Sequence, residues 1–144
     1  MLRLTTRTAY SIKALLDLTI HAQIHPVSGR SIAERQQIPP AYLEKLLLAL
    51  RQAHLIRSQR GSQGGYRLAR PPRSIRLLDI LQAVGEAVDP LPIWDPELVA
   101  DGVVQVVGQR LSLAIHQVLE RITLEDLYFD ACSRQAAEDS GFIV

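Results

Sequence analysis

The alternation of apolar and polar residues between Ser31 and Leu68 predicts two short helices. Ser31 is followed three residues later by Glu34, the spacing of a capping box that begins a helix, and Pro39 ends that helix. A second helix, from Ala41 to Ala53, has an apolar arc of Leu43, Leu46, Leu47 and Leu50 and an opposite arc of Tyr42, Glu44, Lys45, Leu48, Arg51 and Gln52. We therefore expect one face in the core and one face free for a partner.

Two strand-like runs follow the second helix. Leu55 to Ser58 and Gly65 to Leu68 are separated by the segment from Arg60 to Gly64, whose glycines permit the positive φ of a hairpin tip. The order helix, turn, helix and hairpin is that of a winged helix-turn-helix, which is mainly α with a small β-hairpin wing.

Two further helices flank this stretch. Thr5 or Thr6 is a suitable N-cap for a helix to about Ile24. Its predicted core face comprises Ala9, Ile12, Leu16 and Ile20, and its polar face comprises Lys13, Asp17 and His21. The start of this helix is also a candidate phosphate contact, by dipole and charge together. A short helix from Leu77 to Val84 should end at Gly85.

The second half of the chain predicts a long apolar helix. Asp95, Pro96 and Glu97 stand in the preferred order for a helix start, and the apolar pattern continues to Ile122 with one narrow polar stripe at Gln105, Gln109, Ser112, His116 and Glu120. At ~1.5 Å per residue the helix is roughly 40 Å long, too long for so small a lobe to cover. A second copy of the chain is the natural cover, so we expect a dimerisation helix.

After the long helix, Thr123 and Asp126 should cap a short helix that reaches Phe129, with a polar tail beyond it. The predicted organisation is a winged helix-turn-helix domain over residues 1–84, a loop and dimerisation helix with a short following helix over 85–132, and a flexible tail over 133–144.

Charge divides the chain into a basic and an acidic half. Residues 1–76 hold thirteen Lys and Arg against three acids, a net of +10, whereas residues 77–144 hold three Arg against twelve acids, a net of −9. The basic half coincides with the helix-turn-helix pattern, so charge and pattern both indicate a polyanion partner, double-stranded DNA.

Several classes of protein find no support in the sequence. The single cysteine, Cys132, excludes a disulfide within one chain, and no apolar run is long enough to span a membrane, so we expect a cytoplasmic protein. His21 and His25 have a spacing that metal sites use, but the dipole at a helix C-terminus also favours histidines, and we predict no metal site. No defensible catalytic constellation is present, so we predict no enzyme.

The segments LRLTTRTAYSIKALLDL, IAERQQIPPAYLEKLLLALRQAHLI, RGSQGGYRLARP and ITLEDL together resemble the Rrf-type family of bacterial winged-helix repressors, to about Leu127. The resemblance implies a homodimeric regulator whose long helix crosses to the partner. It also implies that Tyr42 and Glu44 face DNA and that Arg60 enters the minor groove. Physically these roles fit, because a carboxylate accepts from a cytosine amino group and arginine suits a narrow A·T-rich groove. The predicted DNA-binding residues are Thr6, Tyr42, Glu44, Lys45, Arg51, Arg57, Arg60, Gly64 and Gly65.

The chain departs from this family at its sensing site. The resemblance implies three cluster-ligating cysteines near the start of the long helix, but residues 85–108 contain none, and Gln105 stands where a histidine ligand is expected. No three-cysteine iron–sulfur site is therefore predicted. Cys132 of two chains sharing a cluster, and Trp94 lining a small-molecule effector pocket, are the weaker alternatives. His54 replaces a glycine, so we expect left-handed backbone there.

The sequence thus predicts a homodimeric, sequence-specific DNA-binding transcription regulator, expected to be a repressor that responds to an effector or redox signal. The alternative is a winged-helix module that binds another protein through its arginine-rich wing and ignores duplex DNA.

Overall fold

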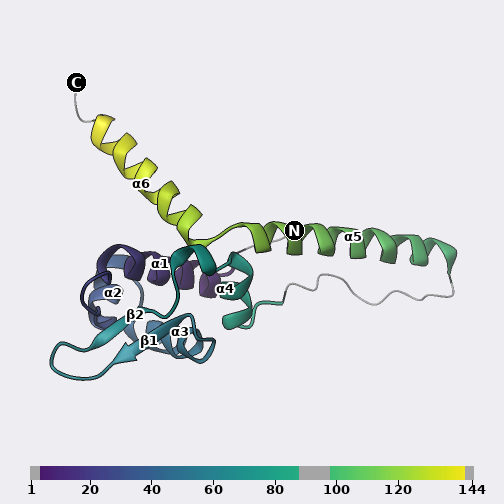
Figure 1. Cartoon of the computed structure of the whole chain (residues 1–144). Coiled ribbons are helices and arrows are strands. Elements are labelled where there is room, and N and C mark those ends of the chain that lie inside the picture. Colours follow the sequence, from purple (N-terminus) through teal and green to yellow (C-terminus); the bar gives the residue numbers. More distant parts are fainter. Residues whose placement is uncertain (1–3, 88–97, 142–144) are drawn as a thin grey trace.

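Seven helical segments and one hairpin form the molecule, of which this computed structural model describes residues 4–87 and 98–141. Figure 1 shows a body built from the first helices and the hairpin, with two helices extending from it. The elements in chain order are α1 (Thr6–His21), α2 (Gly29–Gln36), α3 (Pro40–Gln52), β1 (Ile56–Gln59), β2 (Gly65–Leu68), the 3-10 turn η1 (Pro72–Ser74), α4 (Leu77–Ala83), α5 (Val99–Arg121) and α6 (Leu124–Gly141). The predicted fold class, mainly α with a hairpin wing, is confirmed.

Helix α1 begins as predicted but buries a different face. The Thr5 hydroxyl accepts a hydrogen bond from the Thr8 backbone N–H, which makes Thr5 the N-cap, and the helix ends at His21 rather than Ile24. The buried face comprises Thr8, Ser11, Ala14, Leu15, Asp17, Leu18 and Thr19. Of the apolar face predicted for this helix, Ile12 and Leu16 pack against the core and Ile20 is exposed. Ser11 and Thr19 can be buried because their hydroxyls donate to the carbonyls of the preceding turn, Arg7 and Leu15.

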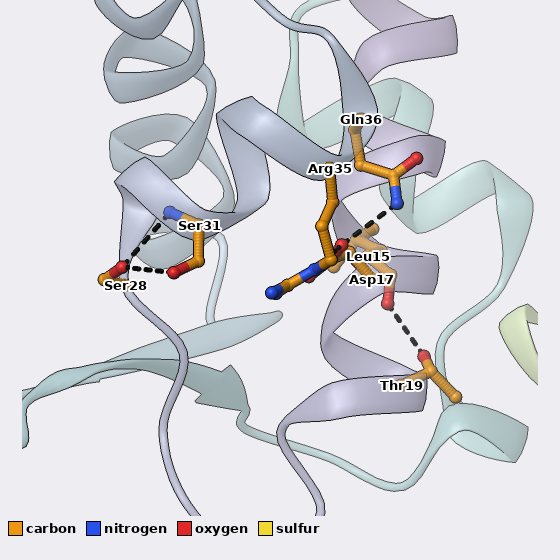
Figure 2. Close-up of polar contacts among 7 residues, drawn as sticks. All are labelled: Leu15, Asp17, Thr19, Ser28, Ser31, Arg35 and Gln36. Atoms are coloured by element: carbon orange, nitrogen blue, oxygen red, sulfur yellow. Dashed lines mark hydrogen bonds and ion pairs between the residues drawn. The ribbon is translucent and has the colours of Figure 1, made fainter.

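The buried carboxylate of Asp17 ties α1 to α2. Asp17 is fully buried, and it accepts two hydrogen bonds from the Arg35 guanidinium, at 2.9 and 2.8 Å, and one from the Gln36 amide at 2.9 Å (Figure 2). Lys13 donates to the Gln36 carbonyl beside them. Burial by itself raises the pKa of Asp17, but the hydrogen bonds from Arg35 and Gln36 outweigh it and hold this pKa below the ordinary value. The polar face predicted around Asp17 is thus an interface between helices.

Helix α2 starts earlier than the capping box predicted. Its N-cap is Ser28, whose hydroxyl accepts from the Ser31 backbone N–H at 3.1 Å. Glu34 does not reach back to Ser31 but pairs with Arg30 one turn away. The prediction was wrong because Ser28 and Ser31 have the same chemistry three residues apart, and the upstream serine caps the helix.

The hairpin is anchored to the body at its base and along β2. Ile56 pairs with Leu68 and Gln59 with Gly65 in antiparallel register, and Val27 forms an isolated bridge with Tyr66 through hydrogen bonds of 2.9 and 2.7 Å. His54 has φ 60°, so the left-handed backbone expected there is confirmed. These bonds fix the hairpin next to α3.

The C-terminal helices differ from the prediction in length and exposure. Helix α5 meets the core only near its C-terminus, through Ile115, Leu119 and Ile122, and Figure 1 shows it projecting away from the body. Thr123 and Asp126 cap the next helix as predicted, but α6 continues through the stretch predicted as a short helix and flexible tail, to Gly141. The predicted end of this helix at Phe129 was therefore wrong, because the polar stretch after it, with three alanines, also sustains a solvated helix. The predicted N-cap at Asp95 lies outside the described residues.

We predict that Arg35→Ala lowers the free energy of unfolding by about 1–3 kcal/mol at pH 7, because it leaves a buried carboxylate without its cation. This value is below that of a fully buried pair, because Arg35 is partly exposed and solvent screens its charge. Because the pKa of Asp17 is lowered, the stabilisation is present above its ordinary value of 3.8 and is lost as pH falls through the folded-state pKa. Urea unfolding of wild type and variant between pH 3 and 7 measures this difference.

The matched control is Arg30→Ala on the same helix, which removes an exposed Arg30–Glu34 pair and should cost less than about 0.5 kcal/mol. Equal losses in the two variants would contradict the role given to Asp17.

Candidate nucleic-acid interface

Helix α3 presents the two faces that its sequence predicts. Leu43, Leu46, Leu47 and Leu50 are buried, at 0–4 % exposure. The exposed face comprises Tyr42, Glu44, Lys45, Leu48, Arg51 and Gln52. No acidic residue stands in the first turn, so the positive end of the helix dipole is left uncancelled there. A helix with this face free can enter the major groove of DNA.

An aromatic contact fixes the start of this face. The Tyr42 ring meets Tyr10 of α1 edge to face, with 5.6 Å between centroids and planes at 85°, and Lys13 lies 5.5 Å from the Tyr10 centroid. Tyr42 is 38 % exposed, so its ring is held on one side and open on the other. Such a side chain is positioned before any partner arrives, which lowers the entropy cost of contact.

Glu44 lies in a surface hollow of about 430 Å³ between the start of α2, α3 and β2, together with Arg30 and Tyr66. Arg30 was absent from the predicted set, although its side chain is 87 % exposed and it is the second residue of α2, two after the Ser28 cap. A helix N-terminus with an arginine beside it suits a phosphate. The signal that sequence reasoning missed was the serine before Gly29, because the cap was assigned to Ser31.

The wing glycines have a structural explanation. A Cβ on Gly65 would stand 2.4 Å from the Val27 carbonyl oxygen, and one on Gly64 would stand 2.3 Å from the Gln59 carbonyl oxygen. Both positions therefore need glycine for the close approach of two backbones. Arg60 is exposed at the hairpin tip, where nothing in the described part of the chain contacts it by hydrogen bond or ion pair.

Two predicted arginines lie on different sides of the hairpin. The Arg51 guanidinium is 3.4 Å from the Ser58 hydroxyl, so Ser58 faces α3. Arg57, the preceding residue of β1, lies with Arg67 on the hairpin's other side, in a cavity against α1 and α6. The sequence placed both arginines among the DNA-binding residues, since it gives no side for a short strand that is exposed over three of four residues.

The start of α1 already holds an internal anion. The Glu86 carboxylate accepts hydrogen bonds from the hydroxyls of Thr5 and Thr8 and lies 3.5 Å from the Arg7 guanidinium. The Thr5 hydrogen bond lowers the pKa of Glu86, with smaller contributions from Thr8 and Arg7. Thr6 itself is exposed beside this cluster. A DNA phosphate at this helix end would meet Glu86, which the sequence separates from Thr6 by eighty residues.

Of the two weaker effector candidates, the structure describes only one. Trp94 lies outside the described residues, and Cys132 is exposed on α6. Over 4–87 and 98–141 no group of three or more His, Cys, Asp or Glu side chains could hold a metal ion. His21 is the last residue of α1 and His25 lies beyond it, so the helical spacing expected of a metal pair does not exist. Within the same ranges no helix combines the length and apolarity needed to cross a membrane.

Comparisons with known proteins agree with this geometry. The model of the Rrf2 family, described as an iron-dependent transcriptional regulator, matches residues 4–130. A Synechocystis sp. protein, provisionally named as an HTH-type transcriptional regulator, is 46 % identical over 147 residues, which cover 99 % of this chain and 100 % of the relative.

Two solved structures are similar in fold and sequence. CymR, the global cysteine regulator of B. subtilis, superposes with a TM-score of 0.77 at 32 % identity, covering 89 % of this chain and 97 % of CymR. IscR of T. potens gives a TM-score of 0.74 at 40 % identity, covering 90 % and 88 % of the two chains. The matched residues include α1 to α5 and the hairpin.

We predict that Gly65→Ala destabilises the hairpin, because the added Cβ meets the Val27 carbonyl and one of the two backbones must move. The loss should be about 1–3 kcal/mol, the range for forced shifts in packed structure. Thermal unfolding measures it. Gly29→Ala is the control, because a Cβ at that position makes only ordinary contacts of 3.5 and 3.7 Å. If the two variants unfold at the same temperature, the role assigned to Gly65 is refuted.

Proposed function

The chain belongs to the Rrf2 family and is a DNA-binding transcription regulator, and from this premise we propose how it engages DNA. Helix α3 enters the major groove, the hairpin tip enters the adjacent minor groove, and two copies joined through α5 bind two half-sites. The observation that carries this proposal is the exposed polar face of α3, which lies beside a hairpin that Arg51 contacts through Ser58 and that Val27 bonds to the body through Tyr66. The relatives named as regulators support DNA over the alternative of a protein-binding wing.

The proposed division of labour follows the exposed side chains. Tyr42 and Glu44 contact base edges, where Glu44 accepts from a cytosine amino group. Lys45, Arg51 and Arg30 contact phosphates, which position the protein without reading sequence. Gly64 and Gly65 act indirectly, by shaping the hairpin that carries Arg60.

Dimerisation is supported by the uncovered surface of α5. Eight large apolar side chains of this helix are 42–87 % exposed: Val99, Val103, Val104, Val106, Val107, Leu111, Leu113 and Val118. So much exposed apolar surface on one helix is uncommon on a monomeric protein and indicates an interface. A two-fold dimer would also place two recognition helices about one DNA turn apart.

The proposed regulator works in the cytoplasm and without a three-cysteine iron–sulfur cluster, because one chain supplies only Cys132. Anaerobic purification followed by an absorption spectrum and iron analysis tests the second point. Visible absorbance that disappears in Cys132→Ser would revive a cluster shared between two chains.

We predict that Arg60→Ala weakens binding about tenfold to operators with A·T-rich flanks and less to operators with G·C-rich flanks, since a narrow minor groove attracts an inserted arginine. Duplexes selected from a random pool by the wild-type protein supply the operator, and fluorescence anisotropy measures affinity.

Arg134→Ala, on the exposed part of α6, serves as the charge-matched control and should leave both affinities unchanged. Equal losses on the two flanks for Arg60→Ala would exclude the minor-groove role.

With ~6–10 phosphates neutralised per dimer, the affinity of the wild-type protein for its operator should fall ~10³–10⁵-fold between 50 and 200 mM salt.

We predict that Val107→Asp converts the dimer into a monomer, because it puts a charge on the apolar surface that the second copy should cover. Sedimentation velocity measures the mass. The control is Gln109→Asp, which puts the same charge two residues further along α5, in the predicted polar stripe. This variant should remain dimeric. A wild-type protein that sediments as a monomer at micromolar concentration would overturn this part of the proposal.

A further inference from the structure

A cavity of about 530 Å³ lies on the side of the hairpin away from α3. Its walls come from four parts of the chain: the last turns of α1, both strands, the segment leading into η1 and the first turns of α6. This volume is within the range of small-molecule sites in proteins. None of the residues proposed above to contact bases lines it, so it is separate from the recognition surface.

Three arginines give the cavity an excess of positive charge. Arg57 and Arg67 are directly opposite each other in the antiparallel register, and both line the cavity with Arg70. Opposed like charges destabilise a strand pair unless something neutralises them. Glu125 is the one carboxylate in the lining, and over the described ranges it forms no ion pair with any of the three. The lining therefore carries three positive side chains and one negative one, an excess of positive charge.

The arginine donors are only partly used. Arg67 donates one N–H to the Ile24 carbonyl at 2.9 Å. Arg70 lies 3.9 Å from Asp79, whose carboxylate is engaged at 2.8 Å by Arg76. The Arg70 Nε is buried and has no hydrogen-bond partner among the described residues. That atom is closed off from the cavity, so the donors open to a ligand are those of Arg57 and the remaining N–H groups of Arg67.

The opposite wall is apolar and aromatic. Leu18 and Ala22 of α1 face Tyr128 and Phe129 of α6, whose ring centroids are 5.7 Å apart. Phe129 is 57 % exposed although it adjoins a cavity. A ligand that fits both walls has an anionic group for the arginines and a flat apolar body for the rings.

We propose that this cavity is an effector site for a small carboxylate carried on an aromatic ring. The carboxylate bridges Arg57 and Arg67, and the ring packs on Tyr128 and Phe129. A bound ligand would join the hairpin to α6, so it links the wing to the segment that follows the dimerisation helix. The consequence for DNA affinity rests on the proposed function, whereas binding of the carboxylate does not.

The test uses the full-length protein without DNA and three probes: phenylacetate, 3-phenylpropionate and the uncharged phenylacetamide. Isothermal titration calorimetry should give saturable binding of the carboxylates with a Kd of about 1 mM or lower, the affinity open to so small a ligand. The amide should bind at least tenfold more weakly. Inorganic phosphate at the same concentration tests for an anion site without an aromatic requirement.

Three variants assign the binding to this cavity. Arg57→Gln should weaken phenylacetate at least tenfold, and Arg73→Gln, an exposed arginine outside the lining, should leave it unchanged. Glu125→Gln removes the one repelling carboxylate and should tighten binding severalfold, a gain that a misfolded variant could not produce. Equal affinity for amide and carboxylate, equal affinity for phosphate, or indifference to Arg57→Gln would each overturn the proposal.

A second measurement separates this inference from the proposed function. Operator affinity is measured by anisotropy with and without saturating phenylacetate, and a change of at least threefold supports the link between cavity and wing. A protein that binds operator but none of the probes refutes the effector site alone. A protein that binds phenylacetate through Arg57 but ignores duplex DNA refutes the proposed function alone.

Discussion

The buried carboxylate of Asp17 is the constraint on which the helix-turn-helix depends. It has no solvent exposure, so it stays charged only if Arg35 and Gln36 are brought to it with their donors aligned. Hydrophobic packing alone is tolerant of rotation, whereas a bidentate pair is not. The pair therefore sets the direction of α2 against α1, and the turn after α2 then delivers α3 with its polar face outward.

The hairpin separates two surfaces of this body, one beside α3 and one beside α6. Val27 bonds it to the body through Tyr66 of β2, and at its base the Leu55 carbonyl accepts from the Ala69 N–H at 3.0 Å, which joins its two arms. Successive residues of β1 point to opposite sides, so Ser58 turns to the recognition helix and Arg57 to the cavity beside α6. A strand of four residues is enough to connect the exposed face of α3 with the C-terminal helix.

The positive side chains of residues 1–76 differ in what they contact. Arg35 and Arg76 pair with the carboxylates of Asp17 and Asp79, and Arg57 and Arg67 line the cavity. Arg30 pairs with Glu34 at the surface, and Arg60 is exposed at the hairpin tip with no ion pair among the described residues. Glu86 shows the opposite case, since an acid from the second half neutralises the start of α1. Total charge identified a polyanion partner, but only the distribution of charges shows which side chains can reach it.

The sequence by itself determined the order of helices and hairpin, the two faces of α3, the apolar character of α5 and the loss of the cysteine site, because periodicity, caps and residue identity are local properties. The tertiary structure decided the buried face of α1, the cap at Ser28, the side of the hairpin that Arg57 occupies and the pairing of Glu86 with Thr5 and Thr8. These features depend on which of several chemically equivalent residues meets a partner distant in the chain, and local patterns do not contain that information.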